Sequence, residues 1–287
     1  MINSGTKIRR AAWAGQFYPG NPENLKRMID QYLDSAPMLD VGGRIIGLVS
    51  PHAGYQYSGA TAAAGYKQLM DVDFTHVIVI APSHAELFPG VSIYDGDYYE
   101  TPLGLIPVDK KLAADIASHG DMLRLSELGH RTSTDRAEHS LEVQLPFLQR
   151  VAANDFKLVP MVFHDYSVAI CRQLANAIVE SIGDKKVVIV ASSDLYHGYS
   201  YDECLETDRR TVQGITSMDG EEFCLYANKG IYQACGAGPI AVLLMVGESL
   251  GADRAIVVDQ TNSADVTGAI GGWTVGYASV LVVKEGK

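Results

Sequence analysis

Three apolar runs in this chain end alike. IIGLVSPH, VIVIAPSH and VVIVASSD finish at His52, His84 and Asp194. Short apolar runs bounded by small residues or proline are typical of strands that are buried on both faces of a sheet. Helical patterns alternate with these runs, so the sequence predicts an α/β fold with a mostly parallel central sheet flanked by helices.

The same alternation extends over the rest of the chain. Strands are expected at 44–50, 76–82, 156–163, 186–192, 254–260 and 273–283, and antiparallel strands with turns within 91–109. Helices are expected at 22–33, 60–70, 166–182, 202–216 and 237–250, from about Asp109, and at 141–152, where Pro146 predicts a kink or a second start. No linker or low-complexity stretch divides the chain, which predicts one domain over residues 1–287.

Composition excludes several classes of protein. A net charge of −11 argues against nucleic acid or an anionic membrane as a partner, because both attract clustered Lys and Arg. No apolar run approaches the roughly 20 residues that span a bilayer, and no apolar segment follows the N-terminal basic residues, so a cytoplasmic protein is expected. The four cysteines form no CxxC pair, which indicates free thiols in a reducing compartment.

The ends of the three runs predict a site. In an open α/β sheet, ligands bind beyond the carboxyl ends of the strands, so His52, His84 and Asp194 are expected to converge there. A single histidine after a strand is more often a capping or core residue than a ligand. Two histidines and an aspartate at equivalent strand ends favour a functional site, because unrelated packing would not select the same edge three times.

Three further residues join the candidates. His139 stands beside Glu138 and Glu142, which suits a proton shuttle or an anion-binding group, or equally a helix-start histidine. His197 follows Asp194 by three residues. Cys235 precedes two nearby glycines at the entry to a helix, whose dipole would stabilise a thiolate, although an isolated cysteine is more often a buried thiol. The remaining histidines lack comparable surroundings and are expected to be structural or surface residues: His76, His119, His130 and His164.

Several motifs in order along the chain resemble one family. AGQFYPG, SPHAGYQYSG, APSH, TPLG, EHSLEVQLPFLQ, SSDLYHG and CGAGPI resemble the Memo family (mediator of ErbB2-driven cell motility) over nearly the whole chain. That family is remotely similar in fold to the class III extradiol (LigB-type) dioxygenases, which are non-haem iron enzymes. The resemblance implies a metal site made by His52, His84 and Cys235, with Asp194 and His197 lining the pocket and His139 nearby.

The resemblance also implies a chemistry. Iron or copper is the expected metal, zinc is a further candidate, and no organic cofactor is expected. His197 would serve as acid and base, with Asp194 as its orienter or an auxiliary ligand, and His139 is a third candidate catalytic residue. A dioxygenase iron site uses two histidines and a carboxylate, whereas a thiolate favours Cu(I), Zn or a more electron-rich Fe, so ring cleavage does not carry over.

Alternative functions stay open at this point. The first is a metal-dependent redox enzyme that acts on an unknown small molecule, and the second is a protein that binds a peptide or ligand in the same cleft. The third is a metal-handling protein. In prokaryotes the family also resembles a partner of radical-SAM and AMMECR1-like proteins, and since this chain lacks CxxxCxxC, any radical chemistry would belong to that partner. A hydrolase is disfavoured because no GxSxG occurs.

Overall fold

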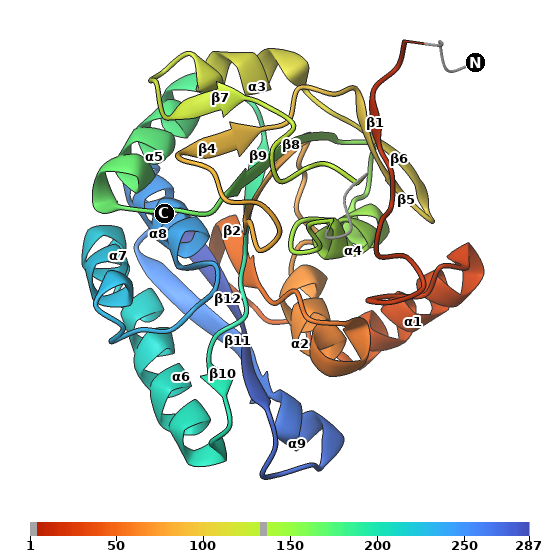
Figure 1. The fold of residues 1–287 in the computed structure, drawn as a ribbon, viewed down its shortest axis with the longest axis vertical. Coiled ribbons are helices and arrows are strands. Elements are labelled where there is room, and N and C mark those ends of the chain that lie inside the picture. The colour runs from red at the N-terminus through yellow and green to blue at the C-terminus, as the bar shows by residue number, and fades with distance from the viewer. Residues whose placement is uncertain (1–4, 133–136, 287) are drawn as a thin grey trace.

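A large mixed sheet forms the centre of the computed structural model, which describes residues 5–132 and 137–286 (Figure 1). Its four central strands run parallel in the order β2, β9, β3, β8. These strands are almost fully buried along their length because helices cover both faces: β2 (Gly43–Ser50), β9 (Val187–Ser192), β3 (His76–Pro82) and β8 (Lys157–Phe163). The predicted α/β class and the parallel centre of the sheet are therefore confirmed.

Both edges of the sheet are antiparallel to the centre. On one side β12 pairs with β2, and then with β10 and β11; on the other side β4 pairs with β8, and β7 pairs with β4 in parallel. A smaller sheet joins β1, β5 and β6. The bounds of these strands are β12 (Thr274–Glu285), β11 (Arg254–Asn262), β10 (His197–Gly198), β4 (Val91–Ile93), β7 (Leu123–Leu125), β1 (Ile8–Arg9), β5 (Tyr98–Thr101) and β6 (Gly104–Pro107).

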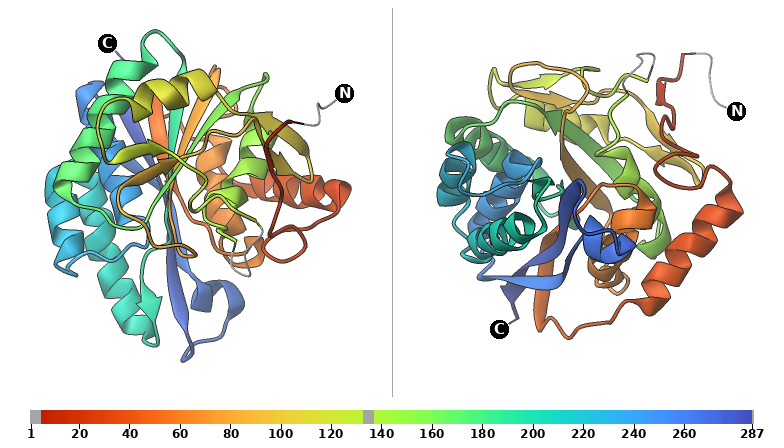
Figure 2. Two further views of the ribbon diagram at one scale, coloured as in Figure 1. Left: turned by 45° about the horizontal axis from the view of Figure 1, so that its top comes forward. Right: turned by 60° about the horizontal axis from the view of Figure 1, so that its bottom comes forward.

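Alternate side chains of each central strand enter different halves of the core. In β3, Val77 and Val79 face one hydrophobic cluster, whereas Ile78 and Ile80 face the other. The first cluster is covered by α1 (Pro22–Ser35), α2 (Tyr55–Lys67), η1 (Glu142–Gln144) and α4 (Leu145–Val151). The second is covered by α3 (Lys110–Ala117), α5 (Val168–Ile182), α6 (Tyr201–Thr216), α7 (Gly220–Asn228) and α8 (Ala237–Ser249). Figure 2 shows these two helical layers from two further directions.

The helix boundaries follow local chemistry. Asn21 caps α1 by accepting hydrogen bonds from Glu23 N and Asn24 N, and Asp109 caps α3 in the same way. The segment with Pro146 is split into η1 and α4, with the proline in the first turn of α4, as predicted. Sequence analysis missed α7 and the five-residue α9 (Ser263–Thr267). Within the described residues, no helix combines the length and the apolar character needed to cross a bilayer.

Candidate metal centre

The carboxyl ends of three neighbouring strands bring the first candidates together. Because β2 and β3 both pair in parallel with β9, the loops that follow them emerge at one edge of the sheet. His52 follows β2 and His84 follows β3, and their ring centroids lie 5.3 Å apart. The structure therefore shows the predicted convergence of these two histidines.

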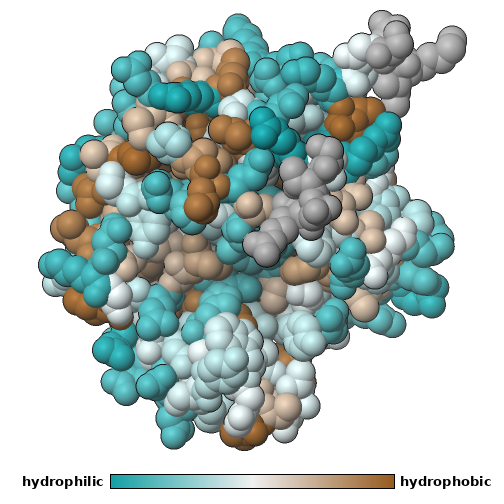
Figure 3. Space-filling view, viewed as in Figure 1, coloured by the Kyte–Doolittle hydropathy of each residue, from teal (hydrophilic) through white to brown (hydrophobic). Residues whose placement is uncertain are grey.

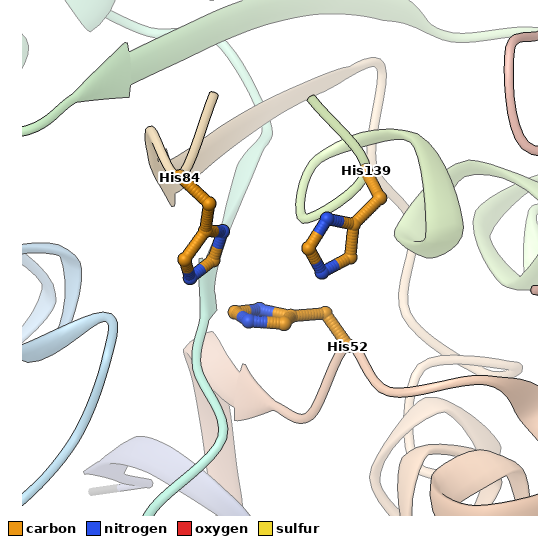
Figure 4. Close-up of side chains that lie close together, drawn as sticks. All are labelled: His52, His84 and His139. Carbon is orange, nitrogen blue, oxygen red and sulfur yellow. The ribbon is translucent and has the colours of Figure 1, made fainter. Parts of the chain in front are cut away.

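A third histidine completes the cluster. His139 comes from the loop before η1, and its ring centroid lies 5.4 Å from that of His52 and 5.0 Å from that of His84 (Figure 4). One ring nitrogen from each of the three lies within 4.8 Å of the other two, a spacing at which they can hold a metal ion. His52 is buried, His139 is half-buried and His84 is exposed, so the cluster opens toward solvent on the side of His84.

Polar side chains behind the rings fix their orientation. Glu138 is buried, and its Oε1 lies 3.1 Å from His84 Nδ1 and 3.4 Å from His139 Nδ1. On the other side, Ser192 Oγ lies 2.9 Å from His52 Nδ1 and donates to the Ser140 carbonyl at 2.6 Å. Since the proton of the serine is already used, His52 Nδ1–H donates to Ser192 and leaves Nε2 unprotonated. Such outer hydrogen bonds are typical of metal-binding histidines.

The thiol of Cys235 lies next to the three histidines. Its Sγ lies 3.1 Å from His52 Nε2 and accepts a hydrogen bond from Asp194 N at 3.2 Å. The cysteine precedes Gly236, the N-cap of α8, and a Cβ at Gly236 would lie 2.2 Å from the Ser192 carbonyl oxygen. Only glycine therefore allows the start of α8 to approach the end of β9 and bring the thiol to the histidines.

Comparisons with known proteins identify the family of this chain. The model of the Memo-like protein family matches residues 9–281. The chain belongs to this family. It is 37% identical over 282 residues to a MEMO1 family protein of Methanosarcina barkeri, and 32% identical over 280 residues to one of Nitrosopumilus maritimus. Both alignments cover 96% of this chain and 100% of the relative.

A solved structure shares the fold at much lower sequence identity. The uncharacterized protein JW3007 from Escherichia coli K12 superposes with a TM-score of 0.58 at 14% identity, over 83% of this chain and 100% of the other. This likeness supports the α/β architecture of the Memo-like chain.

The charges in the Memo-like cluster favour the protonated, positively charged form of His84. Burial lowers the pKa of His84, but hydrogen bonds to Cys235 and Glu138 outweigh it and raise that pKa to about 10. Burial raises the pKa of Glu138, yet its bonds to His84 outweigh burial and bring it down to about 2. Burial lowers the pKa of His139 to about 4 and holds that of His52 well below its usual range. The cluster thus holds one positive charge between a carboxylate and a thiol, where a metal ion can replace the proton.

Cys235 differs from the expectation of a stabilised thiolate. Burial raises the pKa of its thiol, and the hydrogen bond from His84 opposes this rise without cancelling it. Without metal the thiol is therefore the preferred form, and coordination would have to remove its proton. Its membership of the predicted ligand set with His52 and His84 stays a prediction.

Asp194 and His197 lie at the same edge but do not act on each other. Asp194 Oδ1 accepts a hydrogen bond from His52 N at 2.7 Å, and burial raises the pKa of Asp194 to about 7. His197 is exposed, and its Nδ1 lies 3.0 Å from the Leu195 carbonyl. In the described part of the chain, Leu195 and not Asp194 orients the ring, so Asp194 secures the loop of His52. The catalytic roles predicted for both residues stay predictions.

Sequence reasoning missed the supporting residues of the centre. Glu138 was noticed only as a neighbour of His139, although it contacts His84 from 54 positions away. Glu142, expected beside the same histidine, binds Arg9 instead. Ser192 gave no signal beyond its place at a strand end. His130 agrees with the expectation of a structural histidine, because it is buried between the Tyr99 hydroxyl and the Ser92 carbonyl.

Proposed function

We propose that this Memo-like protein is a metal-dependent redox protein that acts on a small molecule. The observation that carries the proposal is the convergence of ring nitrogens from His52, His84 and His139 within 4.8 Å, next to the thiol of Cys235. Imidazole and thiolate together suit iron, copper and zinc better than magnesium or calcium, which prefer oxygen ligands. Iron or copper is proposed because both change oxidation state.

The donor set fits such a metal. His52 and His84 each turn one ring nitrogen to a fixed hydrogen-bond acceptor and leave the other for coordination. Glu138 compensates positive charge directly behind two of the rings. When bound, the metal would supply one-electron chemistry and polarise a coordinated group.

The protein's own residues would position the substrate and move protons. His84 lies on the exposed side, so a substrate would approach past this ring. His197 is exposed and follows by three residues Asp194, whose carboxylate accepts a hydrogen bond from His52 N. We therefore propose His197 as the group that takes or returns a proton at the mouth of the centre.

Metal content after anaerobic purification tests the proposal and its ligand set. Iron and copper would be measured by mass spectrometry after addition of Fe(II), Cu(I) or Zn(II) to wild type, His52→Ala, His139→Ala and Cys235→Ala. Loss of stoichiometric metal in His52→Ala is expected, and the other two variants decide between three histidines and a two-histidine–cysteine set. Cys224→Ala, which changes a buried thiol on α7, is the matched control and should keep the metal.

Two results would count against the proposal. No metal in wild type under any of these conditions would remove the metal centre. Stoichiometric metal without oxygen consumption across a broad panel of small molecules would replace the redox function by metal handling.

A further inference from the structure

Three aromatic side chains lie close together where β10 pairs with β12. We call His197, Tyr199 and Trp273 the aromatic rim. The Tyr199 and Trp273 rings meet edge to face with centroids 4.9 Å apart at 75°, and the centroids of His197 and Trp273 are 6.3 Å apart. Tyr199 is 76% exposed and Trp273 is 54% exposed, so neither ring is needed to fill the core.

A short backbone segment connects the aromatic rim to the metal centre. His197 and Gly198 form β10, which pairs with Val275 and Thr274 of β12 and so aligns Trp273 with the residues around Tyr199. Two residues before His197, Leu195 N donates to the Gly276 carbonyl and ties the same two segments together. Asp194, which precedes Leu195, accepts a hydrogen bond from His52 N. The rim is thus connected to the candidate ligands through one short segment.

The segments that supply the aromatic rim carry acidic but no basic side chains. Residues 191–208 and 255–283, which supply the rim and its flanks, contain no Lys or Arg. Asp202 and Asp265 are exposed in these segments, and the Tyr201 hydroxyl donates to Asp265 Oδ1 at 2.8 Å. In Figure 3 the surface over β10 is mostly pale, and a brown, hydrophobic patch lies at the lower edge of the molecule. Exposed aromatic faces attract organic cations, and the exposed carboxylates of the same segments add to that attraction.

We propose that the aromatic rim binds an organic cation, such as a quaternary ammonium group. As the anchor of a substrate, this site rests on the proposed function, because the ligand would reach from the rim toward the metal. Two rings at nearly a right angle offer the cation two π faces, and the carboxylates add attraction that salt screens. The ligand class of the metal centre would then be small molecules that carry a positive charge.

Binding of choline and of its neutral isostere, 3,3-dimethylbutan-1-ol, to metal-free protein tests the site. Saturable choline binding at millimolar concentration is expected by ligand-observed NMR, at least about threefold tighter than that of the isostere because only choline gains the cation–π term. Trp273→Ala should abolish the difference between the two ligands. Tyr226→Ala, a tyrosine of α7 outside the rim, is the control and should preserve it.

Each outcome distinguishes the rim from the metal centre. Equal affinity for choline and the isostere, or choline binding that survives Trp273→Ala, would overturn the proposal. Because the titration needs no metal, failure to load iron or copper leaves its result intact. Repetition with metal-loaded protein separates the two further, since a rim that binds choline equally in both states stands without the proposed redox function.

Discussion

Two buried glutamates lie four residues apart, one on the loop before η1 and one at its first residue, and they have different kinds of partner. Glu142 binds Arg9 and also accepts hydrogen bonds from Ala12 N and Trp13 N at 3.0 and 2.8 Å. Glu138 faces the imidazoles of His84 and His139 instead. A guanidinium keeps its charge at every accessible pH, whereas an imidazole exchanges its proton for a metal ion. The first cluster is therefore a fixed structural connection, and the second supports a site.

The polar cluster of Glu142, Arg9 and the backbone of Ala12 and Trp13, here called the Glu142 cluster, fixes the N-terminal segment to the core. Arg9 is itself buried and donates to the Glu138 carbonyl, so the structural cluster also supports the loop that carries His139. Its guanidinium lies over the Tyr99 ring at 5.3 Å from the centroid. The two clusters share one loop but not one chemistry, and substitutions can separate them.

Glu142→Gln should give the largest effect. It leaves the buried guanidinium of Arg9 without its countercharge, which typically costs about 3–5 kcal/mol of unfolding free energy. Urea denaturation would measure the loss, and metal binding per folded molecule should not change. The control is Glu100→Gln, which breaks the exposed pair with Arg10 and should cost less than about 1 kcal/mol. A small loss in Glu142→Gln, or a specific loss of metal, would erase the distinction between the clusters.

The pH dependence of the unfolding free energy extends the comparison to a third buried group, His130. Burial lowers its pKa to about 3, so the folded protein resists protonation that the unfolded chain accepts below about 6.5. The unfolded state therefore binds more protons as the pH falls, and His130 should cost about 2 kcal/mol of unfolding free energy between pH 7 and pH 5. His130→Gln should flatten the profile by that amount. A difference between the two proteins that does not depend on pH would show that folding leaves the pKa of His130 unchanged, and the prediction would be wrong.

Much of this arrangement follows from sequence, for a physical reason. Continuous apolar runs identified the central strands, and parallel strands must end at one edge, so the approach of His52 and His84 was predictable. His139 joins them from a loop outside the strand–helix alternation, and no periodicity reports such a contact.

The contacts around His197 could not be predicted from the sequence because they depend on pairing between strands that are far apart in the chain. The orientation of His197 depends on β10, a two-residue strand whose partner, β12, begins 77 positions later. Trp273 and Tyr199 meet through the same pairing, which no local pattern indicates. The short helices α7 and α9 gave too few turns for a periodic signal.

Glu138→Gln tests the second cluster, in which Glu138 faces His84 and His139. Glutamine keeps the size of the side chain but removes the charge behind His84 and His139, and loss of such an outer partner lowers metal affinity by about 10- to 100-fold. Competition with a chromophoric chelator would measure the change. Unfolding free energy should fall less than in Glu142→Gln. Unchanged affinity would mean that Glu138 acts as a purely structural group like Glu142.

Ser192→Ala should give the smallest effect on metal affinity. It tests whether the outer hydrogen bond to His52 contributes to the metal centre. Ser192 Oγ holds His52 Nδ1 at 2.9 Å and is itself held by Gln144 Nε2 at 2.8 Å, so its loss leaves the buried ring without a fixed acceptor. One neutral hydrogen bond contributes about 1 kcal/mol, which predicts a loss of less than about tenfold in metal affinity. Ser193→Ala, which alters the neighbouring hydroxyl that accepts from Gly236 N, is the matched control for the loop of Cys235. A larger loss in Ser193→Ala than in Ser192→Ala would show that placement of the thiol, more than orientation of His52, determines affinity, and would favour the two-histidine–cysteine ligand set over three histidines.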